Sequence, residues 1–372
     1  MPRVVLAYSG GLKTSVAIPW LAENCRVEVV TVTLDLGQAN ALDDVRERAL
    51  SSGAVRAHVI DAREEFVRDA ILPALQAGAI YEGGSPLATA LGRPLIARHL
   101  VEIAHIEGAK EVAHGCSGTG NDHVRLDAAV RALDPSLRVI APAAMWNLTR
   151  AQAVEYARQR GIPVPASVDN SVSVDVNLWG RSIAGGVLDD PWAEPPEDLY
   201  TRTRAPGEAP DSPAYVELEF DRGVPVRING VAMSLVELIQ SLETIAGAHG
   251  VGRVDMVENR LVGAKSREVY ESPAAAALHV AHKALQVYVT PRDLDRLTTD
   301  LGVKYADLVY CGRWYTPARE AIDALIAKVQ EKVTGVVRLK CFKGDCRVVG
   351  RRSPHGLHET SEAHAGAGVE AP

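Results

Sequence analysis

The feature that most constrains the fold is a series of short, mostly apolar segments in the first 165 residues, separated by helical stretches. The segments are rich in β-branched residues and lie at 3–8, 26–35, 55–61, 111–115 and 137–142. Strands that are apolar throughout are typical of a parallel sheet that helices cover on both faces. The pattern therefore predicts an α/β domain whose ligands bind at the carboxyl ends of its strands.

The pattern changes after a proline-rich stretch that predicts a domain boundary at residue 165. The helix before this stretch has Thr149 as its expected N-cap and Gly161 after its last turn. Residues 166–354 are expected to form a second, α+β domain. Residues 355–372 have no hydrophobic periodicity and are expected to form a disordered tail.

Several elements of the second domain can be predicted individually. Residues 214–230 alternate between apolar and polar as a hairpin does, and a late hairpin is expected to turn at 343–345. Helical periodicity is found at 234–250, 273–289 and 316–333.

Composition limits the kind of partner this chain can have. It has 40 Lys and Arg against 47 Asp and Glu, a net charge of −7, which argues against binding nucleic acid by bulk attraction. No apolar run approaches the roughly 20 residues that a membrane span requires. The cysteines are odd in number and scattered, at positions 25, 116, 311, 341 and 346. They favour a reduced, cytoplasmic enzyme over a disulfide scaffold.

The strongest local signal is the segment Ala-Tyr-Ser-Gly-Gly-Leu-Lys-Thr-Ser at 7–15, between the first strand and a helix. Gly10 and Gly11 allow a tight turn whose N–H groups converge, and the helix N-terminus adds positive partial charge. The segment matches neither the Walker lysine loop nor the dinucleotide-binding glycine pattern. It predicts a phosphate site, with a simple capped strand–helix turn as the alternative.

A second glycine-rich loop, 114–122, follows another apolar strand and is expected at the same sheet edge. Asn121 and Asp122 can bind an amine, and Arg125 shares a helical face with Asp122 and suits a carboxylate. The alternative is a glycine-rich turn with an Asn-Asp cap.

Two further segments carry weaker signals. Residues 173–182 are predicted, taken alone, to be a polar loop with one aromatic anchor, and Glu258 and Arg260 to be a surface ion pair. Cys341 and Cys346 flank a hairpin turn without a metal-binding cluster and are interpreted as structural.

Together and in this order, these segments resemble the argininosuccinate synthase family. The resemblance covers essentially the whole chain and is carried by AYSGG (7–11), RPLIAR (93–98), HGCSGTGNDHVR (114–125), NLWGRS (177–182), VENR (257–260) and VVGRRSP (348–354). It implies an ATP-pyrophosphatase-type domain, adenine nucleotide alpha hydrolase-like, followed by a synthetase domain with a C-terminal arm. It also implies a homotetramer with small-molecule substrates, without nucleic acid or membrane as a partner.

The reaction that the resemblance implies is a carbon–nitrogen ligation with ATP and Mg²⁺. A ureido oxygen of citrulline attacks the α-phosphate, pyrophosphate leaves, and the α-amine of aspartate then displaces AMP. Because ATP activates the acceptor, no protein nucleophile is needed, and the protein positions substrates and stabilises charge. No dedicated set of metal ligands is expected.

The resemblance also assigns residues to each substrate. The ATP contacts are Ala7, Tyr8, Ser9, Gly10, Gly11, Leu12, Thr14, Ser15, Leu34 and Gly115. The aspartate contacts are Ser117, Asn121 and Asp122. The acceptor contacts are Asn121, Arg125, Ser173, Ser182, Glu258 and Tyr270. The residues expected to act in catalysis are Lys13, Asp122 and Arg125.

Some positions depart from the family pattern. Lys13 replaces an aspartate beside the phosphates, Ser85 replaces a tyrosine that contacts the amino-acid end of citrulline, and Ala184 replaces an acidic residue. Lysine, glutamine, glutamate and tyrosine of the family are replaced by Thr119, His123, Asp127 and Val172. The aspartate side is thus better kept than the phosphate and acceptor sides.

These departures leave alternatives open beside a ligase that joins aspartate to citrulline or a citrulline-like acceptor. One is a paralogue that uses aspartate with a different ureido, amide or carboxylate acceptor. Another is a binding protein that keeps the fold without catalysis. A relative that modifies RNA is disfavoured by the acidic balance.

Overall fold

The first half of the chain forms a five-stranded parallel sheet. The computed structural model describes residues 1–38, 42–118, 120–146, 148–163, 172–261 and 263–358. The strands run parallel in the order β3-β2-β1-β4-β5. They are β1 (Arg3–Ala7), β2 (Glu28–Asp35), β3 (Arg56–Asp61), β4 (Glu111–His114) and β5 (Arg138–Ile140). The predicted α/β architecture is confirmed.

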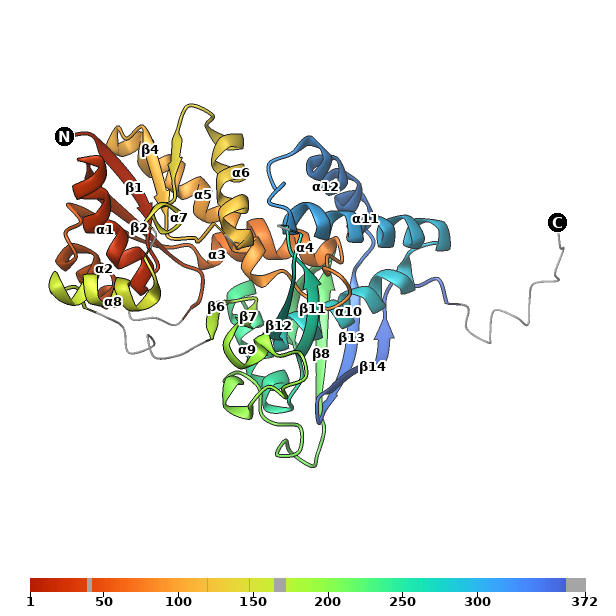
Figure 1. Ribbon diagram of the computed structural model, residues 1–372. Helices are drawn as coiled ribbons and strands as arrows, with labels where there is room; N and C mark the ends of the chain where they lie inside the picture. Colours follow the sequence, from red (N-terminus) through yellow and green to blue (C-terminus); the bar gives the residue numbers. More distant parts are fainter. Residues whose placement is uncertain (39–41, 119, 147, 164–171, 262, 359–372) are drawn as a thin grey trace, which may run out of the picture.

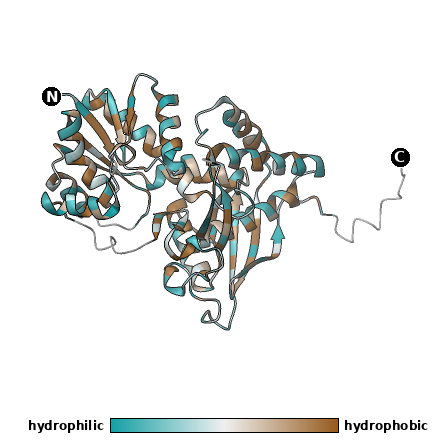
Figure 2. Cartoon of the chain, viewed as in Figure 1, coloured by the Kyte–Doolittle hydropathy of each residue, from teal (hydrophilic) through white to brown (hydrophobic). Residues whose placement is uncertain are grey.

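Helices cover both faces of this sheet because its strands are apolar on both sides (Figures 1 and 2). Val4 and Leu6 belong to an apolar cluster with α1, α2 and α8, whereas Val5 belongs to the cluster that contains α5 and α6. The five helices are α1 (Leu12–Cys25), α2 (Leu42–Ser51), α5 (Ala88–Glu107), α6 (Asn121–Leu133) and α8 (Arg150–Gln159). Shorter helical segments are α3 (Arg63–Phe66), a π-helical turn (Val67–Ile71), α4 (Leu72–Gln76) and α7 (Pro142–Met145).

The end of this half is capped as the sequence predicts. Thr149 accepts a hydrogen bond from the N–H of Gln152, whose side chain reaches back to the Thr149 N–H, a capping box that fixes the start of α8. Gly161 follows the helix with a φ of 64°, a left-handed conformation that suits glycine. The predicted boundary at residue 165 lies outside the described residues.

The second half contains two antiparallel sheets (Figure 1). One has the order β10-β9-β8-β13-β14 and consists of β8 (Ala214–Asp221), β9 (Val224–Ile228), β10 (Val231–Ala232), β13 (Gly335–Phe342) and β14 (Asp345–Arg352). The other has the order β11-β12-β7-β6 and consists of β6 (Ser173–Asn177), β7 (Gly180–Ala184), β11 (Arg253–Asn259) and β12 (Lys265–Glu271). Both predicted hairpins, β8–β9 and β13–β14, are confirmed.

The second half also has four longer helices. They are α9 (Leu235–Ala248), α10 (Pro273–Val289), α11 (Arg292–Tyr310) and α12 (Pro317–Gln330), and two 3-10 turns lie at Gly186–Asp189 and Glu197–Leu199. Of these helices, α9 and α10 pack on the sheets, and α11 and α12 pack on other helices. The predictions at 234–250, 273–289 and 316–333 are confirmed, but α11 was not predicted.

The structure also corrects the prediction of a loop at 173–182. The segment forms the β6–β7 hairpin, and Trp179 at its turn is fully buried and donates its indole N–H to the Pro86 carbonyl at 3.0 Å. Burial of this large ring against α5 fixes the hairpin, which the polar letters around it do not indicate. Most of the predicted tail, 359–372, lies outside the described residues. No helix in the described part of the chain is long and apolar enough to cross a membrane.

Candidate functional site

The two glycine-rich loops meet at the carboxyl edge of the parallel sheet. β1 pairs with β4 so that Ala7 lies opposite His114, and each strand then enters its loop. A Cβ atom added to Gly115 would lie 2.6 Å from the Thr14 methyl carbon, so only glycine permits this approach. The expectation that both loops share one sheet edge is confirmed.

The β1–α1 loop has the geometry of an anion cradle. Gly10 has a φ of +76°, a conformation that glycine adopts without strain, and Arg48 Nη1 donates to its carbonyl oxygen at 2.7 Å. Gly11 precedes α1 and has no side chain to cap the first turn, and no acidic residue lies in that turn. The first N–H groups of α1 therefore face an anionic ligand without a competing carboxylate.

The hydroxyl groups of this loop divide into two sets. Tyr8 Oη and Ser15 Oγ are buried and lie 2.9 Å apart, and Thr33 Oγ1 donates to the Tyr8 carbonyl at 2.9 Å. These contacts hold the buried side of the loop against α1 and β2. Ser9 Oγ, in the turn, and Thr14 Oγ1, in the first turn of α1, lie 3.2 Å apart, and Thr14 Oγ1 also donates to the Gly11 carbonyl at 3.1 Å.

A cavity of about 440 Å³ extends from this loop across to the second half of the chain. The predicted site residues that line it are Lys13, Gly115, Ser117, Asn121, Asp122, Arg125, Ser173, Ser182, Glu258 and Tyr270. The other residues of the predicted ATP set lie around the adjoining β1–α1 turn, except Leu34, which is buried in the apolar core. The structure thus brings together all of the predicted aspartate and acceptor residues around one cavity.

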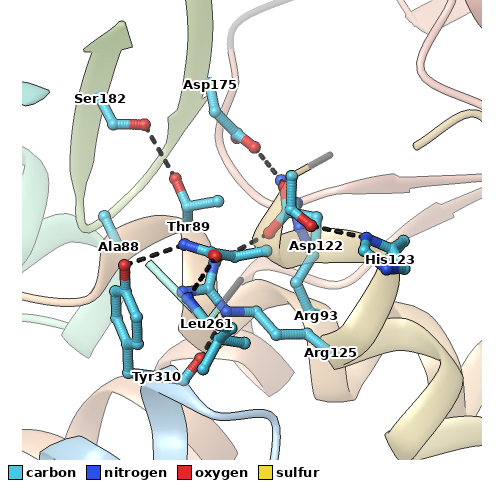
Figure 3. A network of polar contacts seen from close by, with 12 residues as sticks. Ala88, Thr89, Arg93, Asp122, His123, Arg125, Asp175, Ser182, Leu261 and Tyr310 are labelled. Carbon is cyan, nitrogen blue, oxygen red and sulfur yellow. Dashed lines mark hydrogen bonds and ion pairs between the residues drawn. The ribbon is translucent and has the colours of Figure 1, made fainter. Parts of the chain in front are cut away.

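An ion network holds Asp122 at the start of α6 (Figure 3). Asp122 Oδ2 accepts a hydrogen bond from Arg93 Nη2 at 2.8 Å, and Oδ1 accepts one from Arg125 Nη1 at 2.9 Å. Arg93 also pairs with Asp175 on β6. Burial alone would raise the pKa of Asp122, but the two guanidinium groups outweigh it and hold the pKa well below its usual range. Asp122 is therefore an ionised carboxylate at neutral pH.

Glu258 is held by two phenols that come from different elements. Tyr270 Oη donates to its Oε2 at 2.6 Å, and Tyr310 Oη donates to its Oε1 at 2.7 Å. Asn121 Nδ2 donates to Tyr310 Oη at 2.9 Å, while Asn121 Oδ1 accepts from the Leu261 N–H at 3.0 Å. Tyr310, the last residue of α11, thereby links Asn121 of α6 to Glu258 of β11, and Glu258 in turn binds Tyr270 of β12.

The residues of the cavity region that were not predicted include Arg93, Asp175, Glu268 and Tyr310. Arg93 lies in the RPLIAR motif, which was the one signal available for it. Tyr310 lies in the unpredicted α11, where its ring stacks on Tyr81 with centroids 3.6 Å apart. Asp175 and Glu268 reach the cavity only through the register of the β6, β7 and β12 strands.

Asp122 and Glu258, two carboxylates of the site, are each held by other side chains. Among the described residues, no group of three or more His, Cys, Asp and Glu side chains could hold a metal ion. Asp122 is instead paired with arginines and Glu258 with phenols.

Comparison with known proteins gives the family. The family model described as "Arginosuccinate synthase N-terminal HUP domain" matches residues 3–163, and "Arginosuccinate synthase C-terminal domain" matches residues 172–368. The chain belongs to the argininosuccinate synthase family. It is 55% identical over 357 residues to the argininosuccinate synthase of Symbiobacterium thermophilum, covering 96% of this chain and 89% of that protein. It is 51% identical to that of Dictyoglomus turgidum, with 97% and 90% covered, and 52% identical to that of Gloeobacter violaceus, with 97% and 91% covered.

The departures from the argininosuccinate synthase pattern lie mostly around the same cavity. Lys13, Ser85 and Ala184 line it. His123 Nδ1 lies 2.6 Å from the Gly120 carbonyl, and Asp127 Oδ1 lies 3.0 Å from His114 Nε2, so both stay within the β4–α6 region. Val172 packs in a small cluster near Ile183, and Thr119 lies outside the described residues.

Proposed function

We propose that this chain is an ATP-dependent carbon–nitrogen ligase that joins aspartate to citrulline and releases AMP and pyrophosphate. Identity of 51–55% to curated argininosuccinate synthases over nearly the full length supports this activity. The structural observation that carries it is the single cavity in which the phosphate-type loop, the ionised Asp122 and the Glu258 cluster meet. No observation favours a different acceptor or a binding protein without activity.

The first step activates the acceptor. The ureido oxygen of citrulline forms a bond to the α-phosphorus of ATP, and the bond from that phosphorus to pyrophosphate breaks. The N–H groups of the 7–15 turn, the hydroxyls of Ser9 and Thr14, and Lys13 bind the phosphates, and Gly115 contacts the nucleoside. Mg²⁺, if it accompanies ATP, would neutralise negative charge on the phosphates and on the leaving pyrophosphate.

The second step forms the new bond. The α-amine of aspartate attacks the activated ureido carbon, AMP leaves with the electron pair of the broken C–O bond, and the amine loses its proton. Ser117, Asn121 and Asp122 hold aspartate. Asn121, Arg125, Ser173, Ser182, Glu258 and Tyr270 hold the acceptor. Since neither step uses a protein nucleophile, rate acceleration comes from positioning and from charge stabilisation.

The assembly and compartment are part of the same proposal. We infer a cytoplasmic homotetramer of chains divided at about residue 165, with the second domain in the contacts. Five free cysteines suit a reducing compartment. The Trp192 side chain, 94% exposed in the segment between β7 and β8, supports a contact there, since large aromatic side chains are enriched in interfaces. Light scattering on the purified chain tests the tetramer.

The activity is tested by product analysis with ATP, Mg²⁺, aspartate and citrulline. We expect equal amounts of AMP and pyrophosphate, and argininosuccinate as the joined product. Stoichiometric ADP and inorganic phosphate without AMP would contradict attack on the α-phosphate. A parallel panel of ureido, amide and carboxylate acceptors shows whether citrulline is preferred.

A further inference from the structure

One face of the β11-β12-β7-β6 sheet forms a wall of the cavity. In the antiparallel pair β12–β7, Tyr270 lies opposite Ser182 and Glu268 lies opposite Ala184. Side chains two residues apart on a strand point to the same face, and directly opposite side chains share it. Glu268 therefore faces the same space as Tyr270 and Ser182, and all four residues line the cavity.

Glu268 is an acidic side chain that lies directly opposite Ala184. The family pattern has an acidic residue at 184, which is alanine here. The Cβ atoms of directly opposite residues lie roughly 4.5–5.5 Å apart, so a carboxylate on β12 can reach the volume next to Ala184. The Glu268 carboxylate thus lies across the strand pair from Ala184 and lines the same cavity.

The space for Glu268 is provided by the turn that contains Ser85. A Cβ atom on Gly84 would lie 2.8 Å from Met256 Sδ, and Met256 is the register partner of Glu268 on β11. The turn therefore packs on the same sheet face, beside Glu268. Ser85, where the family pattern has a tyrosine, lines the same cavity as Glu268.

The surroundings of Glu268 leave its charge incompletely balanced. Ser266 Oγ donates to its Oε1 at 3.3 Å. The other titratable groups that act on it are Glu258 on β11, which repels it, and Arg260 and Arg125, which attract it. Burial, followed by the Glu258 charge, raises the pKa of Glu268 to about 7. A cationic ligand would relieve this cost and favour the ionised form.

We propose that Glu268 is a specificity-determining residue that accepts hydrogen bonds from the α-ammonium group of the acceptor amino acid, in place of the acidic residue missing at 184. This inference rests on the proposed function, because it assumes an amino-acid acceptor in this cavity. It predicts that the chain distinguishes citrulline from 5-ureidopentanoate, the same molecule without the ammonium group.

The test compares four proteins: wild type, Glu268→Gln, the double variant Glu268→Ala with Ala184→Glu, and Glu208→Gln as a control. Glu208 is an exposed carboxylate in the loop that precedes β8, so its change alters net charge equally but leaves the cavity intact. Calorimetry with a non-hydrolysable ATP analogue gives the Kd of citrulline and of 5-ureidopentanoate. Pyrophosphate release gives turnover separately.

We expect Glu268→Gln to weaken citrulline binding by about ten- to a hundredfold, the usual effect of losing a charged hydrogen bond. Its affinity for 5-ureidopentanoate should match wild type, and the double variant should regain most of the citrulline affinity. Wild-type affinity for citrulline should rise from pH 6 to pH 8, as Glu268 ionises, and Glu268→Gln should lack this rise.

The inference is overturned by any of three results. The Kd of Glu268→Gln for citrulline lies within threefold of the wild-type value, the substitution raises the Kd of citrulline and of 5-ureidopentanoate equally, or wild type does not bind citrulline. Failure of the proposed function gives a different result, the absence of pyrophosphate release by wild type with citrulline. The two results are distinguishable because affinity is measured without turnover.

Discussion

Asp122 shows how single residues of this site are prepared for a substrate. Its carboxylate is kept ionised by Arg93 and Arg125, so it can bind the ammonium group of aspartate at any pH near neutrality. We expect Asp122→Ala to raise the KM for aspartate about ten- to a hundredfold, because a charged hydrogen-bond partner contributes about 1.5–3 kcal/mol. Steady-state kinetics at fixed ATP and citrulline measures this, with Asp300→Asn on exposed α11 as the control. An unchanged aspartate KM would refute the assignment.

Lys13 is the largest single change of charge in the site. It lies exposed in the first turn of α1 and lines the cavity, and the resemblance to the family leads us to expect an aspartate at this position. At about 4 Å and an effective dielectric constant near 20, one pair of unit charges is worth about 4 kcal/mol before desolvation. If Lys13 neutralises the leaving pyrophosphate in place of part of the metal's role, Lys13→Asp should lower kcat or raise the Mg²⁺ requirement. A rise in pyrophosphate release instead would mean that Lys13 impairs the site, and a change of less than severalfold would mean that Lys13 faces water.

At the scale of elements, the site depends on how closely the two strand-end loops approach each other. Gly115→Ala would place a methyl group 2.6 Å from the Thr14 methyl carbon, and the β1–α1 and β4–α6 loops would have to separate. We expect the KM for ATP to rise by about tenfold or more, and by more than the KM for aspartate. Gly207→Ala, where an added methyl meets no atom within 4 Å among the described residues, is the matched control. Equal ATP KM values for the two variants would contradict this coupling.

The elements that the sequence could predict are those whose signal is local. Apolar strands, the Thr149 capping box and the β8–β9 and β13–β14 hairpins each follow from neighbouring residues. The β6–β7 hairpin does not, since Trp179 packs against the distant Pro86. The sequence analysis did not predict α11, although its buried residues recur at helical spacing. It therefore did not predict the role of Tyr310, the last residue of this helix.

The same distinction holds for the site. The two glycine-rich loops could be placed together from the sequence, because each follows a strand of a parallel sheet and the carboxyl ends of β1 and β4 lie at the same edge. Glu268 could not be found in this way, because a shift of one residue in the β12–β7 register would turn its side chain to the other face. Residues whose role depends on register or on a distant partner remained outside the prediction.

At the scale of the whole molecule, ionisation of the buried Glu268 carboxyl is expected to lower the stability of the fold. The folded-state pKa of Glu268, about 7, lies above the ordinary glutamate value of 4.5, so the folded chain holds this proton more tightly than the unfolded chain. Its ionisation therefore destabilises the fold as pH rises from about 4.5 through 7, by at most about 3 kcal/mol, since one pKa unit corresponds to 1.36 kcal/mol and the side chain is partly solvated.

Glu268→Gln removes this penalty, and its thermal stability relative to wild type reports the whole effect. We expect the variant to have the higher Tm at pH 8 and a Tm close to that of wild type at pH 5, where the wild-type carboxyl is protonated in the folded chain. Differential scanning calorimetry at the two pH values, without substrates, measures the difference. Saturating citrulline should raise the Tm of wild type more than that of the variant, because the ligand's ammonium group compensates the buried charge. A Tm difference that does not depend on pH would show that the side chain acts by packing alone, and that no charge is held in the wall for the acceptor.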